Sequence, residues 1–110
     1  MARCAVTGGN GFVGSQIVRE LLRRGHDVTA LVGADLDAEN LRGLPVKLRD
    51  LDLLDPRNVR AALDGAEWVV HSAACYAFWA RDPRAIYRIN VEGTRNVLRA
   101  ARELGVPKVA

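Results

Sequence analysis

Short apolar runs alternate with longer amphipathic segments along this chain. The apolar runs have the length and composition of buried strands, and they fall at residues 4–6, 27–32, 46–49, 67–71 and 106–110. The amphipathic segments place apolar side chains three or four positions apart, which predicts helices. These helices are expected to begin near Phe12, Pro56 and Pro83 and to end near Arg24, Gly65 and Gly105.

The expected helices carry boundary signals of their own. Asp55-Pro56 combines an N-cap carboxylate with a proline at the first helical position, and Gly25 is the expected left-handed residue after the first helix. A polar connection spans residues 33–44, with one helical turn expected near residues 38–42. The expected buried faces are Val13, Ile17, Val18, Leu21 and Leu22; Val59, Ala62 and Leu63; and Ile86, Ile89, Gly93, Val97, Ala100 and Leu104.

Strands that alternate with helices predict βαβ units, and hence a parallel sheet with right-handed crossovers. The fold class is therefore α/β, a Rossmann-type parallel sheet with helices on both faces that stops at its fifth strand. Its 110 residues suffice for one domain, residues 1–110. Ligands of such sheets bind beyond the carboxyl ends of the strands, so candidate site residues are expected there.

A glycine-rich segment, residues 7–14, joins the first strand to the first helix. Two spacings fit it, Gly9-x-Gly11-x-x-Gly14 and Gly8-x-x-Gly11-x-x-Gly14. Strand, glycine turn and helix together are typical of dinucleotide binding, because a diphosphate reaches the helix N-terminus only where no Cβ blocks it. In both spacings Gly11 admits the diphosphate and Gly14 permits close packing of helix on strand. The alternative is a glycine-rich hairpin without a ligand.

Composition and charge exclude several classes of protein. No apolar run is long enough to span a membrane, and the N-terminus shows no secretory signal, so a cytoplasmic protein is expected. The net charge of +3 comes largely from arginines on the polar sides of predicted helices, which favours solvated surfaces over nucleic-acid binding. Cys4 and Cys75 form no metal or redox motif, and Cys4 is expected to be a small buried apolar residue.

Four motifs together resemble the extended short-chain dehydrogenase/reductase family, the NAD(P)-dependent epimerases and dehydratases. They are Thr7-Gly8-x-x-Gly11-x-x-Gly14, Asp52-Leu53, His71-Ser72-Ala73-Ala74 and Asn90-Val91-Glu92-Gly93-Thr94-x-Asn96. Residues 76–83 are most similar to the dihydroflavonol-reductase-like branch, especially the hopanoid-associated sugar epimerases. The resemblance covers essentially the whole chain and implies that it is the N-terminal portion of a longer enzyme.

The resemblance implies a set of cofactor-binding residues. Gly8, Gly11 and Gly14 would line the diphosphate, and Phe12 and Val13 would offer backbone N–H groups to it. Asp52 would accept a hydrogen bond from the adenine amino group, with the Leu53 backbone beside the ring. Ala73 and Ala74 would pass close to the nicotinamide-side ribose. Asn90 would steady the active-site backbone and a water relay. Alternatives remain for Asp52 as a turn residue and for Asn90 as a buried amide. His71 is interpreted as structural rather than catalytic.

Cofactor choice and catalysis are left open by departures from the family pattern. In the family pattern, an arginine at the place of Gly33 often holds a 2′-phosphate, and an acid at the place of Val32 often selects NAD. From the loop, Asp35 and Asp37 could bind the ribose, and Arg42 could reach a 2′-phosphate. The cofactor is therefore NADP or NAD, with dual or NADPH-leaning use expected. Cys75 and Ala77 also depart from the branch, which usually has an acidic and a basic residue at these two places, so the substrate contacts are left open.

The expected catalytic pair, Tyr-x-x-x-Lys, is absent: Ala80 and Val91 stand four residues after Tyr76 and Tyr87. No catalytic residue is therefore assigned, and the chain alone is expected to show no turnover. The interpretation is the NAD(P)-binding portion of an epimerase, dehydratase or reductase whose parent acts on a small sugar-nucleotide or ketone substrate. The alternative is a non-catalytic dinucleotide-binding sensor or scaffold. An open strand edge at the C-terminus makes a homodimer a further expectation.

Overall fold

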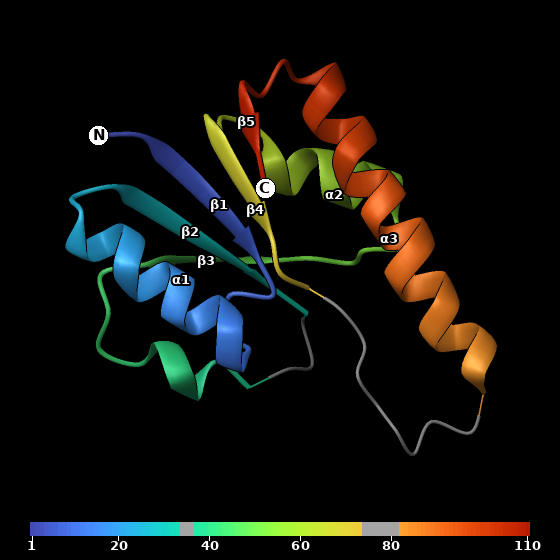
Figure 1. The fold of residues 1–110 in the computed structure, drawn as a ribbon, viewed down its shortest axis with the longest axis horizontal. Coiled ribbons are helices and arrows are strands. Elements are labelled where there is room, and N and C mark those ends of the chain that lie inside the picture. The colour runs from blue at the N-terminus through green and yellow to red at the C-terminus, as the bar shows by residue number, and fades with distance from the viewer. Residues whose placement is uncertain (34–36, 74–81) are drawn as a thin grey trace.

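The computed structural model describes residues 1–33, 37–73 and 82–110. Its elements are β1 (Arg3–Thr7), α1 (Phe12–Arg23), β2 (Asp27–Val32), the 3₁₀ turn η1 (Glu39–Leu41), β3 (Lys47–Asp50), α2 (Pro56–Leu63), β4 (Trp68–His71), α3 (Pro83–Glu103) and β5 (Lys108–Val109). The strands form one parallel sheet in the order β3-β2-β1-β4-β5 (Figure 1). This order confirms the predicted Rossmann-type α/β fold.

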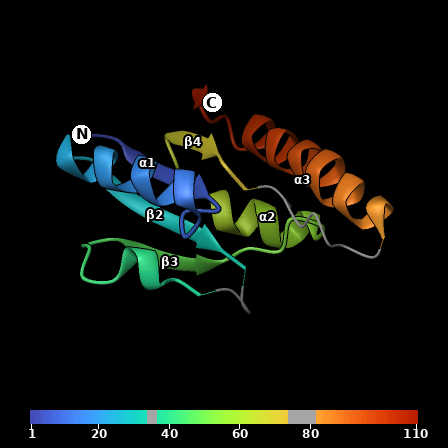
Figure 2. The same cartoon turned by 60° about the horizontal axis from the view of Figure 1, so that its bottom comes forward.

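Two apolar clusters cover the two faces of the sheet. Cys4 and Val6 of β1 pack with Val18 of α1 on one face, whereas Ala5 packs with α2 and α3 on the other. This alternation follows from the two-residue period of a strand. On the second face α2 and α3 lie side by side, away from α1 (Figures 1 and 2). Helices therefore cover both faces, as predicted, and Cys4 is buried, with 2% of its surface exposed.

The boundaries of the helices follow local sequence signals. Asp55 caps α2 by accepting hydrogen bonds from the amides of Arg57 and Asn58, at 3.0 and 3.4 Å, and Asp82 caps α3 in the same way through Arg84. In each case a proline follows at the first helical position. Gly25, Gly65 and Gly105 follow the three helices with positive φ angles of 85, 84 and 69°.

The two edge strands of the sheet and the first turns of α3 differ most from the expected pattern. Every residue of β3 is exposed, because this edge strand pairs only with β2. The predicted strand at residues 106–110 is reduced to Lys108–Val109. Ile86 and Ile89 are not fully buried, since the first turns of α3 extend past the sheet (Figure 1), and the buried face of this helix begins at Gly93.

Candidate functional site

The glycine segment joins β1 to α1 at the carboxyl edge of the sheet, where β1 and β4 both end (Figure 1). Gly8 has a φ of 65° and donates its amide hydrogen to the Leu31 carbonyl at 2.8 Å. A Cβ at Gly8 would lie 2.8 Å from the Cα of Ala73. The turn after β1 is therefore packed directly against the segment that leaves β4, and both a left-handed backbone and steric contact require glycine at this position.

Two further glycines are required by packing within the protein. A Cβ at Gly14 would overlap the carbonyl oxygen of Gly8 and lie 2.9 Å from its carbonyl carbon. A Cβ at Gly9 would lie 2.7 Å from the Cβ of Ala30. Because real Cβ atoms do not approach other atoms so closely, both positions admit only glycine, whether or not a ligand binds. Gly14 was predicted to permit close packing of helix on strand, whereas the atoms that it approaches belong to Gly8 and Gly9 in the turn after β1.

Gly11 stands in a different environment. It is the N-cap of α1, its φ of −75° suits any residue, and a Cβ there would meet only the Gly8 oxygen, at 3.3 Å. No side chain caps this helix, and its first turn contains no acidic residue. The first backbone acceptor inside the helix is the Gly11 carbonyl, which receives the Ser15 amide at 2.8 Å.

The amides of Phe12, Val13 and Gly14 therefore have no acceptor within α1, and the helix dipole makes this end electropositive. The side chains here are open as well, since Phe12 is 84% exposed. The expectation that Val13 is buried is wrong, because its side chain in the first turn of α1 is 60% exposed. Uncapped amides, the dipole and missing Cβ atoms together form a geometry suited to an anion such as a phosphate.

Asn10, an unassigned position of the glycine motif, ties the turn to the connection after β2. The side-chain nitrogen of Asn10 donates to the backbone carbonyl of Asp37 at 2.9 Å, and the backbone carbonyl of Asn10 accepts from the side chain of Asn40 at 2.9 Å. Arg19 of α1 donates to the Asn40 carbonyl at 2.8 Å. The loop expected to contact the ribose 2′ position is thereby held to the glycine turn at its Asp37–Asn40 end. Asp35 lies outside the described residues.

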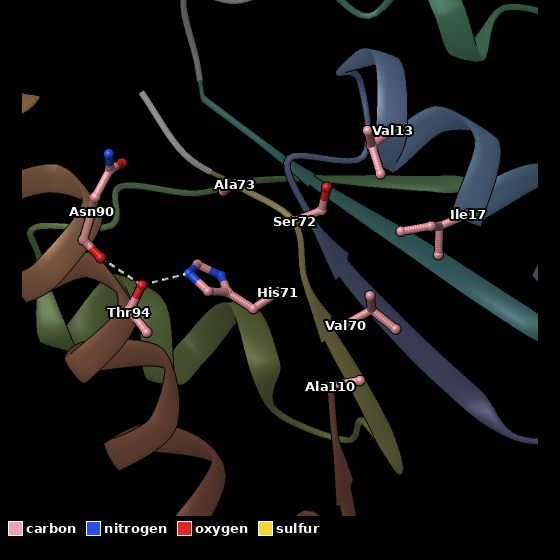
Figure 3. Close-up of a pocket in the computed structure, with 9 residues that line it drawn as sticks. All are labelled: Val13, Ile17, Val70, His71, Ser72, Ala73, Asn90, Thr94 and Ala110. Atoms are coloured by element: carbon pink, nitrogen blue, oxygen red, sulfur yellow. Dashed lines mark hydrogen bonds between the residues drawn. The ribbon is translucent and has the colours of Figure 1, made fainter. Parts of the chain in front are cut away.

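His71 ends β4 and links this strand to β1 and to α3; Figure 3 shows its contact with α3. Its Nδ1 lies 2.7 Å from the Thr7 hydroxyl of β1, and its Nε2 lies 2.9 Å from the Thr94 hydroxyl of α3. The amides of Ser72 and Ala73 donate to the Thr7 hydroxyl at 3.0 and 3.1 Å. Burial lowers the pKa of His71 below its usual 6.5. These contacts agree with the structural role predicted for His71.

A cavity of about 430 Å³ opens beside this network. It is lined by Ser72 and Ala73 after β4, by Val13 of α1 and by Asn90 and Thr94 of α3 (Figure 3). This volume lies within the range of small-molecule sites, about 300–1,000 Å³. The fold thus brings three of the predicted site residues, Val13, Ala73 and Asn90, to one cavity, and Gly8 packs against its wall through Ala73.

Asp52 and Leu53 lie after β3 and do not line this cavity. One carboxylate oxygen of Asp52 accepts the Leu54 amide at 3.1 Å, which is the turn geometry left open as an alternative for this residue. The Leu53 side chain lies under α3, where a Cβ at Gly93 would come within 3.0 Å of it. The Leu53 carbonyl accepts from the side chain of Asn96 at 2.8 Å. Ala74 lies outside the described residues.

Three residues at this edge had no role assigned from the sequence, although all three fall within the quoted motifs. Thr7 directly precedes the glycines, Asn10 lies between them, and Thr94 lies one helical turn after Asn90. The i, i+4 spacing of Asn90 and Thr94 is a usable signal, because it allows the hydroxyl of Thr94 to reach the Asn90 carbonyl, at 2.6 Å here.

A model of the NAD-dependent epimerase/dehydratase family matches residues 4–110. The chain belongs to this family. The resemblance inferred from the motifs is thereby confirmed, and so is the NAD(P)-binding Rossmann character of the chain. Among the described residues, no helix combines the length and the apolar character needed to cross a membrane.

Family members of known sequence and structure extend the comparison. A putative dihydroflavonol 4-reductase of Synechocystis sp. is 43% identical over 109 residues, which are 98% of this chain and 32% of that protein. The sterol demethylase protein B of Methylococcus capsulatus is 39% identical over 104 residues, 94% of this chain and 32% of that protein. The chain thus spans about a third of the length of these relatives.

Solved structures of family members share the fold. The crystal structure of gox2253 matches with a TM-score of 0.91 at 42% identity, over 99% of this chain and 33% of that one. The UDP-glucose 4-epimerase of Thermus thermophilus, solved in complex with NAD, matches with a TM-score of 0.83 at 36% identity, over 97% of this chain and 36% of that one. The part that matches is the N-terminal, NAD-binding portion of the family fold.

Proposed function

We propose that the N-terminus of α1 binds the diphosphate of NAD(H) or NADP(H). The observation that carries this proposal is the environment of Gly11, where a Cβ would meet one protein atom, the Gly8 carbonyl oxygen, at 3.3 Å, without the overlap found at Gly8, Gly9 and Gly14. Its φ of −75° suits any residue, and this contact requires the oxygen to move by only a few tenths of an ångström, so the approach of a ligand is the stronger reason for glycine here. The uncapped amides of Phe12 and Val13 would then donate to the diphosphate oxygens.

The residues around the cavity fit the remainder of a dinucleotide. Ala73 is small and packs on Gly8, so that a nicotinamide-side ribose could pass close to the backbone after β4. Asn90 lines the same cavity from α3. We assign to it the family role of steadying the active-site backbone. When bound, the nicotinamide would supply or accept the hydride, and this chain would bind it and shield one side.

Asp52 and Leu53 are proposed to contact the adenine end, on the basis of the family motif. The turn in which Asp52 takes part occupies one of its carboxylate oxygens, and a carboxylate has further lone pairs for an amino group. Packing of the Leu53 side chain under Gly93 fixes the backbone that would lie beside the ring.

For the cofactor, we propose dual use with a preference for NADPH. No acid stands at Val32 to repel a 2′-phosphate. Arg42 is a long cationic side chain in the adjoining connection, paired at 3.2 Å with the exposed Glu39. An exposed pair of this kind contributes little, so Arg42 can exchange Glu39 for a phosphate at small cost. The oxidoreductase, epimerase or dehydratase reaction belongs to a longer protein that would contain this segment.

Calorimetric titration of the chain with NADH and NADPH tests both proposals. Gly11→Val places a branched side chain where the diphosphate would approach, and we expect binding of both cofactors to be abolished. The unfolding transition in urea serves as the control that the variant is folded. Unchanged affinity in a folded Gly11→Val chain would overturn the site, and a hundredfold preference of the unmodified chain for NADH would overturn the cofactor assignment.

A further inference from the structure

A chain of hydrogen bonds crosses the carboxyl edge of the sheet through the ring of His71. Figure 3 shows its part from His71 through Thr94 to Asn90. It begins at the amides of Ser72 and Ala73, passes through the Thr7 hydroxyl and the imidazole, and ends at Thr94. It therefore connects the glycine turn, the segment after β4 and the helix that carries Asn90.

The direction of every bond in this chain can be assigned. The Asn90 carbonyl can only accept, so the Thr94 hydroxyl donates its one proton to it, at 2.6 Å. Thr94 must then accept from His71, which requires a hydrogen on Nε2. A neutral ring with hydrogen on Nε2 has an acceptor at Nδ1, and the Thr7 hydroxyl donates to it at 2.7 Å. The Thr7 oxygen remains free to accept both amides.

A protonated imidazole does not fit the same arrangement. With hydrogen on both nitrogens, Nδ1 would become a third donor directed at Thr7, beside the amides of Ser72 and Ala73. A hydroxyl oxygen has two lone pairs, and the Thr7 proton would lose its acceptor. At least one of the bonds that hold the segment after β4 would therefore break.

We propose that His71, as the neutral tautomer with hydrogen on Nε2, is a positioning residue that holds Ser72 and Ala73 against the glycine turn and thereby sets the affinity for the dinucleotide. This inference rests on the proposed cofactor site. The contact that transmits the effect is that of Ala73 with Gly8, which leaves no space for a Cβ atom. A shift of Ala73 would therefore displace either the turn or the wall of the cavity. Burial, which lowers the pKa of His71, favours the neutral ring in the same way.

Among the described residues, few charged groups lie around the ring. Thr7 on β1 and Thr94 on α3 are neutral, and the α1 residues that line the cavity, Val13 and Ile17, are apolar. On the β5 side, the backbone carbonyl oxygen of Ala110 accepts the His71 amide at 2.8 Å. Among the described residues that line the cavity, His71 is the one with an ionisable side chain, and burial lowers its pKa.

The first test measures the tautomer without any ligand. Nitrogen-15 NMR of the histidine rings distinguishes protonated from unprotonated ring nitrogens, and His71→Phe assigns the signals. At about pH 7.5 we expect His71 to be neutral, with hydrogen on Nε2. A ring with hydrogen on Nδ1, or one charged at this pH, would overturn the proposal.

The second test measures affinity for NAD⁺ from mildly acidic to neutral pH, where the charge of its diphosphate does not change. For the unmodified chain we expect affinity to fall below the pKa of His71 by up to about tenfold per pH unit, the limit for one linked proton. His71→Phe should bind weakly at every pH. His71→Asn, which offers an oxygen acceptor to Thr7 and does not become charged, should restore much of the affinity and show no pH dependence.

The outcomes separate this inference from the proposed function. If the unmodified chain binds NAD⁺ and Gly11→Val does not, the cofactor site stands. In that case a His71→Phe chain with unmodified affinity, or a His71→Asn chain that keeps the original pH profile, would overturn only the role of His71. If the unmodified chain binds NAD⁺ at no pH, the cofactor site fails, and the positioning role fails with it.

Discussion

Replacing Gly11 by aspartate should stabilise the fold while it abolishes cofactor binding. Gly11 already has the extended N-cap conformation, with φ −75° and ψ 174°, so the new side chain needs no change of backbone. Its carboxylate could accept the exposed amides of α1, and an N-cap aspartate exceeds glycine by only a few tenths of a kcal/mol. The charge adds about 0.3–1 kcal/mol through the helix dipole. One contact, 3.3 Å from the new Cβ to the Gly8 oxygen, offsets part of this gain.

The same carboxylate would repel the diphosphate from its place. At a separation of about 5 Å and an effective dielectric constant of about 20, each phosphate charge is disfavoured by roughly 3 kcal/mol. The aspartate also occupies the amides of α1 that the diphosphate would need. Since every 1.4 kcal/mol is about a factor of ten, the loss in affinity should exceed about a hundredfold.

Urea unfolding and calorimetric titration with NADH measure the two effects separately. Gly14→Ala is the contrasting variant, because its Cβ would overlap the backbone of Gly8 and would strain the turn. It should lower the free energy of unfolding by about 1–3 kcal/mol or more. A Gly11→Asp chain that bound NADH as the unmodified chain does, or that was destabilised as much as Gly14→Ala, would contradict the role of Gly11 in binding.

Two further measurements address other parts of the chain. In a Cys75→Ser background, the Cys4 thiol should react with a thiol reagent only as fast as the protein opens, because it is buried and burial raises its pKa; fast labelling of the folded chain would contradict this. The 110-residue chain should form dimers through the free edge of β5. Ala110 makes both of its backbone hydrogen bonds to β4, so the backbone N–H and C=O of Val109 point away from β4. Val109→Pro should remove the outward N–H and leave a monomer in size-exclusion chromatography, and an unchanged dimer would exclude this edge.

Local signals in the sequence were sufficient to place most elements. The pairs Asp55-Pro56 and Pro83 after Asp82 mark helix starts because a carboxylate cap and a proline act within one turn. Glycine stops a helix just as locally, through its own φ angle, as at Gly25. The α/β class follows from the alternation of strands and helices, and the motifs were sufficient to identify the family. All of these effects act over a few residues or over the whole pattern.

Contacts between segments that are far apart in the sequence were not predictable in this way. Thr7 and His71, at the ends of β1 and β4, are 64 positions apart, and Asn10 and Asn40 are 30 apart, so their hydrogen bonds depend on how the sheet brings these segments together. Nothing in the sequence indicates that the glycine turn is held to the connection after β2. Likewise, the periodicity of α3 includes Ile86 and Ile89, but the length of the sheet decides how much of that face is covered.

The glycine motif shows most clearly what the structure adds. In the sequence, Gly11 and Gly14 are expected to admit the diphosphate and to permit close packing, and the family motif interprets Gly8, Gly11 and Gly14 together as a phosphate loop. In the structure, Gly8, Gly9 and Gly14 are each required by atoms of the protein itself, so their presence says nothing about a ligand. At Gly11 the protein itself offers only one close contact, 3.3 Å from a Cβ to the Gly8 oxygen, and no positive φ. A glycine that the fold does not require, at the uncapped start of a helix, is therefore the position at which substitution can separate binding from stability.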